Sequence, residues 1–374
     1  MKKTLRIGFD AKRAFYNRRG LGNYSRDVIR ILSEQENEND YLLFTPSLKN
    51  AIHFPLSSQC RIITPSGLFR TAFSSAWRTF GQCKEIREEK LDIYHGLSHE
   101  LPYGIEKCNV RTVVTMHDVI FLKQPELYPF VDRHVYRKKY TTACQKADKI
   151  VAISQQTKCD LIEYLNIDER RIEVVYQGCH PVFKKRFDET FKKAVLQKHD
   201  LPDQYMLIVC AIERRKNHEL ILKAMQAGKL DLPLVVVGRP SEYKNELLRL
   251  ISRYQLEQKI LFRYPVETEE LAAIYQSASL FLYPSLYEGF GIPILEALVS
   301  EVPVITSKGG CFTETGGDAA CYVSHDDAEE LADAIGRITE NRALASQMVE
   351  KGRIHAALFS DEHIAESLMA IYTQ

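Results

Sequence analysis

The sequence lacks the features that mark most specialised classes of protein. Its formal net charge is only +1 over 374 residues, which argues against a globally basic nucleic-acid binder. No apolar run approaches the roughly 18 residues that a membrane-spanning helix needs. The short apolar run near the start is interrupted at Arg6 and ends at Asp10, so we do not expect a secretory signal.

Familiar metal and nucleophile motifs are also missing. The nine cysteines form no Cys-x-x-Cys pair, so we expect reduced thiols in a cytoplasmic protein, most of them in or near the core. The sequence contains no GxxxxGK[ST], HExxH or GxSxG, which argues against the chemistries that these motifs carry. It has no Asp-x-Asp diad of the kind that holds a metal-bound nucleotide, and we therefore expect no metal.

What is present is the composition of an ordinary globular protein, with 45% apolar and 26% charged residues. A chain of this length favours two domains, at about 100–200 residues each. Residues 1–178 have 28 Lys and Arg against 21 Asp and Glu, whereas residues 179–374 have 22 against 28. A basic half and an acidic half suggest domains with different partners, although drift in surface composition explains the difference equally well.

Short β-branched runs alternate with longer amphipathic stretches along the whole chain, which is the pattern of βαβ units around a parallel sheet. A polar segment after Gly178 favours a domain boundary there. We expect an α/β fold of two tandem Rossmann-like doubly wound domains, 1–178 and 179–359, facing a central cleft. A capping serine at Ser360 predicts a last helix over 360–374, which we expect to pack back on the first domain.

The most informative segment is SLYEGFGIPILEAL, which follows the predicted strand LFLY. Gly289 and Gly291 let the backbone approach a ligand closely, and a helix N-terminus after them offers N–H groups to phosphate. Glu288 lies before this phosphate site and Glu296 lies on the first helical turn, and both can accept hydrogen bonds from hydroxyls. A ligand with phosphate in the middle and hydroxyls at both ends fits, as a sugar nucleotide does.

This segment resembles the signature EGFGxPxxEA of the retaining glycosyltransferases of family four, which have the GT-B fold. The resemblance covers nearly the whole chain. It implies that Glu288 contacts hydroxyls of the donor sugar and that Glu296 binds the ribose. It also implies that the amides of Gly289, Phe290 and Gly291 hold the donor phosphate.

A second motif, IERRKN, follows the predicted strand YMLIVCA. On its own it is explained by a solvated basic turn, but cations at this place can neutralise a diphosphate. Relatives carry GxLxPRKN here, which aligns Arg215 and Lys216 with the cations of the donor pyrophosphate. Others carry Gly-Arg where this chain has Cys210 and Ala211, so Lys216 is the firmer assignment and Arg215 replaces the missing Arg.

A His-Asp pair, His117 and Asp118, ends a predicted strand of the first domain. Such a pair is more often structural, but both side chains can bond sugar hydroxyls. Relatives carry HD with a following PExYP, which implies that His117 lies near the donor sugar. Asp118 then orients His117 or binds the acceptor.

Gly20 and Gly22 precede a predicted helix, but Ser25 stands where a dinucleotide fingerprint needs its third glycine. Relatives have GIGRYxxxL here, a loop that helps to close the site around donor phosphate and acceptor, although a simple helix-starting loop explains the pattern as well.

Weaker matches to the family occur at four further positions. Val266 corresponds to the place where the relatives' backbone meets the nucleobase. Ser154, Gln155 and Glu314 correspond to positions that line or brace the cleft, and helix capping alone explains Ser154.

The resemblance therefore implies a hexosyltransferase that needs no metal or other cofactor and works with retention. Its donor is a nucleoside-diphosphate sugar, with GDP-mannose first because HD-containing relatives include many mannosyltransferases, and UDP-glucose, UDP-GlcNAc and UDP-galactose open. Its acceptor is a glycan or a lipid-linked glycan in polysaccharide biosynthesis. Alternatives are a GT-B phosphorylase or sugar-nucleotide epimerase, a catalytically weak sugar-nucleotide-binding subunit, or an NAD-dependent oxidoreductase, against which the missing GxGxxG counts.

A last pattern concerns the acceptor side. The segment Gly67–Arg87 interleaves basic residues with Phe69, Phe73, Trp77 and Phe80, whose spacing predicts one helical face. Such a face can lie in an anionic membrane interface, which would give the first domain a peripheral contact at the cytoplasmic side of a membrane. A helix packed on its own sheet is the more common use of such a stripe.

Overall fold

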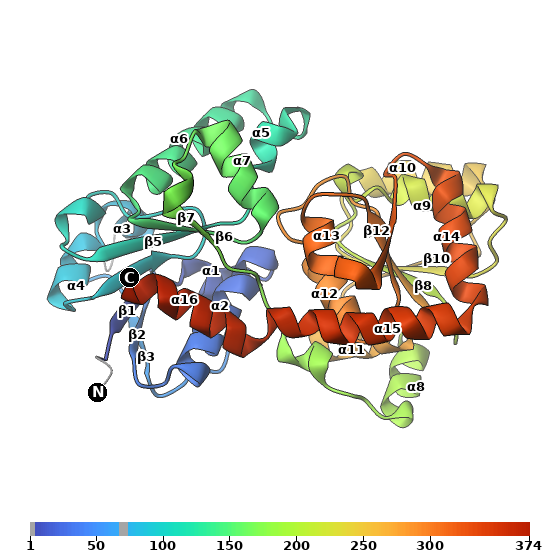
Figure 1. Cartoon of the computed structure of the whole chain (residues 1–374), viewed down its shortest axis with the longest axis horizontal. Coiled ribbons are helices and arrows are strands. Elements are labelled where there is room, and N and C mark those ends of the chain that lie inside the picture. The colour runs from blue at the N-terminus through green and yellow to red at the C-terminus, as the bar shows by residue number, and fades with distance from the viewer. Residues whose placement is uncertain (1–3, 67–73) are drawn as a thin grey trace. The chain divides into compact units, whose positions relative to one another are not determined.

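The computed structural model describes residues 4–66 and 74–374, which form two α/β units (Figure 1). Unit 1 comprises the chain up to Gly178 together with Phe359–Gln374, and unit 2 comprises Cys179–Leu358. Each unit is a parallel sheet with helices on both faces, which is the doubly wound architecture that the alternating pattern predicts.

The sheet of unit 1 has seven parallel strands in the order β3-β2-β1-β4-β5-β6-β7. The chain order reverses between β1 and β4, where Ile7 pairs with Ile93. The strands are β1 (Arg6–Asp10), β2 (Asp40–Phe44), β3 (Cys60–Ile63), β4 (Ile93–Gly96), β5 (Arg111–Met116), β6 (Lys149–Ala152) and β7 (Ile172–Val174).

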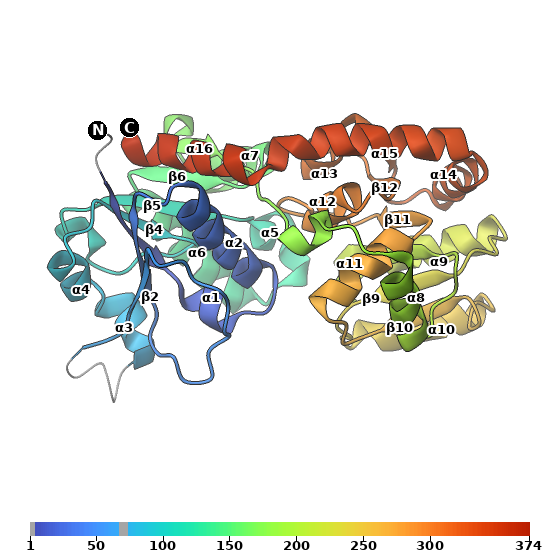
Figure 2. The same cartoon turned by 90° about the horizontal axis from the view of Figure 1, so that it is seen from below.

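Eight described helices belong to unit 1. The last of them, α16, packs along α2, and the two lie side by side in both views (Figures 1 and 2). The Arg30 guanidinium of α2 lies 2.7 Å from the Asp361 carboxylate of α16. The helices are α1 (Lys12–Tyr16), α2 (Gly20–Gln35), α3 (Ser74–Phe80), α4 (Cys83–Glu88), α5 (Ile120–Lys123), α6 (Phe130–Lys146), α7 (Gln155–Leu165) and α16 (Asp361–Thr373).

The sheet of unit 2 has six parallel strands in the order β10-β9-β8-β11-β12-β13, and it reverses between β8 and β11. The central strands consist of apolar residues only, apart from one terminal tyrosine, because helices cover both faces. The strands are β8 (Met206–Val209), β9 (Leu234–Val237), β10 (Ile260–Arg263), β11 (Leu280–Tyr283), β12 (Val304–Ser307) and β13 (Ala320–Val323).

Eight described helices cover the sheet of unit 2. Among them, α9 packs against α14 and α12 against α15. They are α8 (Glu189–Lys198), α9 (His218–Ala227), α10 (Tyr243–Arg253), α11 (Thr268–Ser277), α12 (Ile292–Val299), α13 (Cys311–Gly316), α14 (Ala328–Glu340) and α15 (Arg342–Ala356).

The prediction that the aromatic residues of Gly67–Arg87 share one helical face is wrong for the two whose side chains the structure describes. Residues 67–73, with Phe69 and Phe73, lie outside the described part of the chain. Trp77 is fully buried and stacks on Phe44 at 6.3 Å between ring centroids, whereas Phe80 is 65% exposed. The two rings therefore do not share one outward face, because Trp77 packs on its own sheet.

The placement of Gly20 and Gly22 in a loop is also wrong, because α2 begins at Gly20 and includes both. A Cβ atom on Gly22 would lie 1.7 Å from the backbone oxygen of Asn17, at the end of α1, whereas a Cβ atom on Gly20 would meet nothing within 4 Å. Because it has no Cβ atom, Gly22 thus allows α1 and α2 to lie close together.

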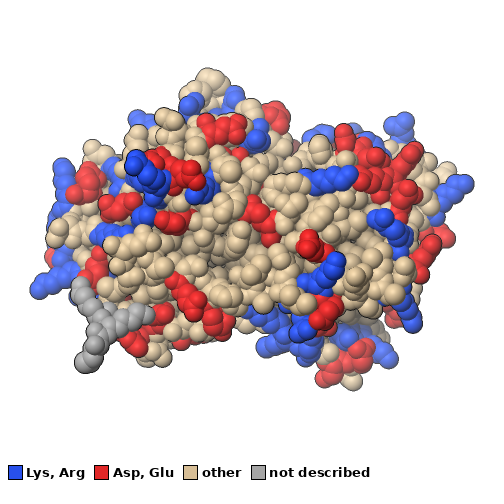
Figure 3. Space-filling view, viewed as in Figure 1, with Lys and Arg blue, Asp and Glu red and all other residues tan. Residues whose placement is uncertain are grey.

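All nine cysteines are free, and four of them are buried. Within the described part of the chain, each helix is too short or too polar to cross a membrane. On the face drawn in Figure 3, Lys and Arg side chains are interspersed with Asp and Glu on both units. The basic excess of the first half is therefore not gathered into one patch on that face.

Candidate active site

The two motifs of unit 2 meet at the point where its strand order reverses. Ligands of open α/β sheets bind beyond the carboxyl ends of the strands at such a point. The loop after β8 forms a single 3₁₀ turn over Arg214–Lys216. The loop after β11 leads into α12, and the backbone N–H of Leu286 donates to the oxygen of Arg215, which fastens the two loops together.

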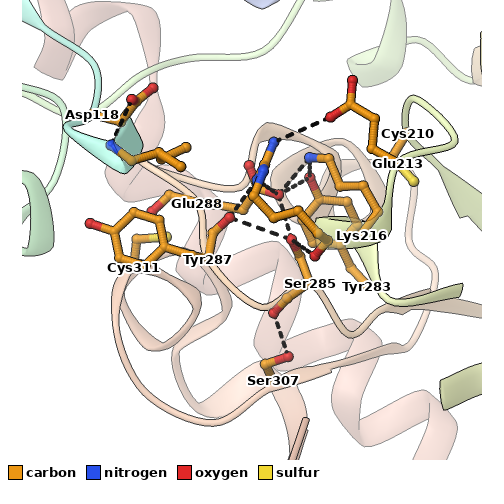
Figure 4. Close-up of polar contacts among 12 residues, drawn as sticks. Asp118, Cys210, Glu213, Lys216, Tyr283, Ser285, Tyr287, Glu288, Ser307 and Cys311 are labelled. Carbon is orange, nitrogen blue, oxygen red and sulfur yellow. Dashed lines mark hydrogen bonds and ion pairs between the residues drawn. The ribbon is translucent and has the colours of Figure 1, made fainter. Parts of the chain in front are cut away.

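Glu288 is the centre of a buried polar cluster (Figure 4). Its Oε1 atom lies 2.5 Å from the Lys216 ammonium and 2.7 Å from the Arg215 guanidinium. The same oxygen accepts hydrogen bonds from the hydroxyls of Ser285, at 2.6 Å, and Tyr283, at 3.2 Å. The carboxylate is thus fixed by four donors, of which Arg215 and Lys216 lie in the loop after β8, Tyr283 ends β11 and Ser285 lies in the loop after it.

These contacts decide the charge of Glu288. Burial raises its pKa, but the charges of Lys216 and Arg215 lower it by more, and the net pKa is about 2. Glu288 is therefore an anion at neutral pH and accepts hydrogen bonds rather than giving protons. The two cations outnumber the one carboxylate that they share, which suits an anionic ligand, and the exposed Glu213 carboxylate lies 3.9 Å from Arg215.

Lys216 is 8% exposed, and its ammonium donates to Tyr283 at 2.8 Å and to Glu288. An ammonium has three N–H donors. No other hydrogen-bonding partner of Lys216 lies among residues 4–66 and 74–374, so one donor is left for a ligand.

The glycines of the EGFG motif shape the start of α12. Gly291 is the N-cap with φ of 95°, a conformation that glycine adopts without strain. Gly289 and Phe290 are buried, and the Phe290 oxygen accepts a hydrogen bond from Thr315 at 2.6 Å. Within the first turn of α12, Pro293 has no N–H and the Ile294 N–H donates to the Gly291 oxygen at 2.8 Å, so any amide donors for a phosphate lie at the very start of the helix, before Pro293.

Glu296 differs from its prediction in one respect. It lies beyond the first turn of α12, which contains no acidic residue, because the helix begins at Ile292. Its carboxylate accepts a hydrogen bond from the buried Tyr275 hydroxyl at 3.0 Å. This bond fixes the position of the Glu296 carboxylate.

Of the four positions with weaker matches to the family, two lie in unit 2 and two lie in unit 1. Val266 is half-buried in the loop between β10 and α11. Glu314 lies on α13, and its backbone oxygen accepts a hydrogen bond from His355 at 3.0 Å. Ser154 caps α7 by accepting from the Thr157 N–H at 3.0 Å, which is the capping role, and Gln155 is the first residue of that helix.

In unit 1, His117 lies directly after β5 and is buried. Its Nε2 atom is 2.9 Å from the oxygen of Leu97. A carbonyl only accepts, so Nε2 carries the proton and Nδ1 is the acceptor of the neutral ring. Burial lowers the pKa of His117 to about 4, although the bond to Leu97 opposes the shift. His117 is therefore neutral at pH 7.

A cluster of rings that sequence reasoning missed surrounds His117. Tyr24 meets it edge-on at 4.5 Å between centroids, and the His99 ring lies at 5.0 Å and accepts through Nδ1 from the backbone N–H of His117. Tyr24 also bonds Thr115, which bonds His95. His95 and His99 have no sequence signal beyond their proximity to the end of a strand. Tyr24 stands at the tyrosine of the GIGRYxxxL motif of the relatives, which is the signal that could have identified it.

Asp118 has a local role in addition to any role toward a ligand. Its Oδ1 atom accepts from the Ile120 N–H at 3.1 Å, which starts α5 (Figure 4). The structure describes no group of three or more His, Cys, Asp and Glu side chains, within its two described ranges, that could hold a metal ion.

Two family models match the two halves of the chain. Residues 18–182 match the model described as Glycosyltransferase Family 4, and residues 189–355 match the one described as Glycosyl transferases group 1. The chain is also similar to O-antigen chain mannosyltransferase B of Escherichia coli. The identity is 27% over 385 residues, which cover 98% of this chain and 99% of that protein.

Solved structures match over almost the whole chain. Sucrose-phosphate synthase from Thermosynechococcus elongatus has a TM-score of 0.78 at 20% identity and covers 99% of this chain and 98% of its own. Anabaena Alr3699/HepE, solved in complex with UDP-glucose, has a TM-score of 0.72 at 15% identity, with 99% and 100% covered. At these identities the likeness shows the fold alone.

Proposed function

Because the chain belongs to the family-four, group 1 glycosyltransferases and has their GT-B fold, we propose that it transfers mannose from GDP-mannose to a glycan, with retention of configuration. The name of the Escherichia coli relative supports a mannosyl donor and a role in polysaccharide biosynthesis. We propose a lipid-linked glycan as the acceptor and the cytoplasmic face of a membrane as the place of action.

One observation carries this proposal: the cluster of Glu288, Arg215 and Lys216 beside the start of α12. A nucleotide sugar needs cations and N–H donors for its diphosphate and acceptors for its sugar hydroxyls. The cluster supplies both within one hydrogen-bonded network. The Glu288 anion is the hydroxyl acceptor, and the two cations with the α12 amides are the phosphate donors.

The residues have separate roles in the proposed reaction. The bond from the sugar anomeric carbon to the phosphate oxygen breaks, and the acceptor oxygen forms its bond on the same face. The acceptor's proton passes to the leaving phosphate. Arg215 and Lys216 stabilise the diphosphate as charge develops on it, because preorganised cations are strongest where charge appears. Neutral His117 accepts a hydrogen bond from a donor-sugar hydroxyl through Nδ1.

The test is a donor panel with the purified protein. GDP-mannose, UDP-glucose, UDP-GlcNAc and UDP-galactose are each incubated with a mannose-terminated oligosaccharide, and nucleotide release and product mass are followed. The proposal expects release and transfer with GDP-mannose above the others, and an α-linked product by NMR. Transfer from a UDP-sugar instead would identify that sugar nucleotide as the donor. A β-linked product from GDP-mannose would contradict retention of configuration.

The same assay separates the alternatives. Phosphate-dependent formation of a sugar phosphate would identify a phosphorylase, and a donor changed in configuration without acceptor would identify an epimerase. Nucleotide-sugar binding without any turnover would identify a binding subunit.

A further inference from the structure

Unit 1 has a pocket of about 350 Å³ at the carboxyl edge of its own sheet. The end of β1, at Asp10, and the loop after β4, at Glu100 and Leu101, contribute to its lining. The strand order of unit 1 reverses between β1 and β4, so the pocket occupies the point where doubly wound sheets bind ligands. None of the residues assigned above to the donor lines it.

The walls of the pocket are apolar and come from three elements: the end of α3, the loop after β4, and α6. Phe80 and Tyr103 are each 65% exposed, and their rings lie 6.1 Å apart. Val135 on α6 is 46% exposed. Large apolar side chains grouped around a concave site usually mark a binding surface for an apolar ligand.

The acidic groups in the floor are already neutralised. Arg78 donates to the Asp10 carboxylate at 2.6 and 2.8 Å and to Glu100 at 2.7 Å. This network engages both carboxylates, and the other polar side-chain groups of the lining, apart from Arg78 and the lysines, are the hydroxyls of Thr79, Tyr103 and Thr142. A ligand whose innermost part, at the floor of the pocket, is apolar therefore fits better than a sugar.

The rim of the pocket is cationic. Lys138, Lys139 and Lys146 on α6 all line it. Lys139 is 3.8 Å from Glu100, and Lys146 lies over the Tyr103 ring. Lys138 makes no ion pair with any acidic side chain in the described ranges. Apolar walls below a rim of lysine side chains match a molecule with an apolar chain and a phosphate head group.

We propose that this pocket binds the first apolar units of a lipid phosphate, with Lys138 and Lys139 contacting the phosphate. The inference rests on the proposed function, since it identifies the lipid end of the lipid-linked acceptor. The position at the strand-order reversal places the head of this lipid at the same sheet edge as His117.

Binding of farnesyl phosphate is the direct test, because it needs neither donor nor acceptor glycan. We expect saturable binding, measured by calorimetry. Farnesol and inorganic phosphate should each bind at least tenfold more weakly, because each supplies half of the recognition.

Two variants and one matched control locate the site. Val135→Glu puts a charge in the apolar wall and Lys138→Glu reverses the rim, and each should weaken farnesyl phosphate binding at least tenfold. Val131→Glu is the control, because Val131 lies on the same helix, is 68% exposed and does not line the pocket. Its affinity should match that of the wild type. All three positions are exposed, and a melting curve checks folding.

Absence of saturable binding, or equal losses in Val135→Glu and Val131→Glu, would overturn the pocket assignment. Equal affinity for farnesol would overturn the phosphate contact. If sugar transfer to a soluble acceptor succeeds while farnesyl phosphate does not bind, the pocket assignment fails and the proposed function stands. If farnesyl phosphate binds in the pocket without any sugar transfer, the proposed function fails instead.

Discussion

Glu288 and its two cationic partners depend on one another. Removing one charge from a buried cluster leaves the others uncompensated, and such a loss costs several kcal/mol in buried ion pairs. The same three side chains carry the proposed chemistry. Substitutions here therefore act on function and on stability, and each needs a control in the same loop.

Glu288→Gln should reduce sugar transfer by about 10²-fold or more, because a neutral amide is a weaker acceptor for a reacting sugar than a preorganised anion. Glutamine keeps the shape of the side chain. The measurement is kcat/KM of the purified variant, with circular dichroism to check the fold. Glu213→Gln is the control, since Glu213 is exposed and lies 3.9 Å from Arg215. Near-normal turnover in Glu288→Gln would remove Glu288 from the site.

Lys216→Ala should weaken GDP binding by about 1.5–3 kcal/mol, the usual range for hydrogen bonds to charged groups. The loss for GMP should be smaller, because the proposed contact is with the outer phosphate. Calorimetry measures both. Arg214→Ala is the matched control, because Arg214 lies in the same turn but pairs with Glu246. Equal losses for GDP and GMP would place Lys216 away from the outer phosphate.

Metal removal is the third residue-scale test. We expect EDTA to leave activity in place, because Arg215, Lys216 and helix N–H groups supply the positive charge that a metal supplies elsewhere. The assay compares initial rates with EDTA and with added Mg²⁺ or Mn²⁺. A complete loss that Mg²⁺ restores would show that a metal is required.

At the scale of the element, α2 shows how one glycine fixes the packing of two helices. Gly22 allows the backbone of α2 to approach the end of α1, and no larger residue fits there. The family resemblance implied that this glycine lies in a ligand-closing loop, with a helix-starting loop as the equal alternative. Its short-range contact with Asn17 depends on the tertiary fold and leaves no periodic signal.

Gly22→Ala should therefore destabilise the protein by about 2 kcal/mol or more, because the new methyl group meets backbone atoms that cannot move aside. Gly20→Ala should change the stability by less than about 1 kcal/mol, since its Cβ meets open space. Chemical denaturation of both variants gives the comparison. Similar midpoints for the two variants would contradict the packing argument.

Other elements show where sequence patterns succeed. Amphipathic patterns in the sequence predict helices over Gln155–Leu165 and His218–Ala227, and α7 and α9 have these bounds. The capping Ser154 precedes α7, and the turn over Arg214–Lys216 precedes α9. The pattern over Ala72–Glu89 predicts a single helix, but in the described part of this segment α3 ends at Phe80 and α4 begins at Cys83. Helix α8 was not predicted, because its polar composition resembles a linker.

At the scale of the whole molecule, strand order explains how the site residues come together. Sequence patterns placed Arg215, Lys216 and Glu288 after strand ends, and the parallel sheet brings those ends to one edge. The patterns did not predict the partners Tyr283 and Ser285, which depend on how two distant loops meet. The rings around His117 were missed for the same reason.

Buried histidines give the whole molecule a defined pH dependence. Burial lowers the pKa of His95 to about 3 and the pKa values of His117 and His218 to about 4. An unfolded histidine binds a proton near pH 6.5, so between pH 6.5 and 4 the unfolded state binds more protons. Stability therefore falls as the pH falls, by up to about 1.4 kcal/mol per pH unit for each such histidine.

The melting temperature should accordingly drop between pH 7 and pH 5 at constant ionic strength. The lowered pKa of Glu288, about 2, acts mainly below this window, because that carboxyl is largely ionised in both states above its ordinary pKa of 4.5. His95→Asn should show a smaller slope than the wild type, measured by scanning calorimetry. A melting temperature that stays level or rises toward pH 5 would contradict this account.

The packing of α16 on unit 1 affects the order in which the two units can fold during synthesis. The ribosome releases the first 178 residues long before Phe359–Gln374, which belong to the same unit. Until then, unit 1 lacks the helix that packs on α2 and the Tyr372 hydroxyl that bonds His95 at 2.6 Å. Unit 2 has no such missing piece, since its chain is continuous, and so it can complete its fold first, although domains usually complete folding in the order of their synthesis.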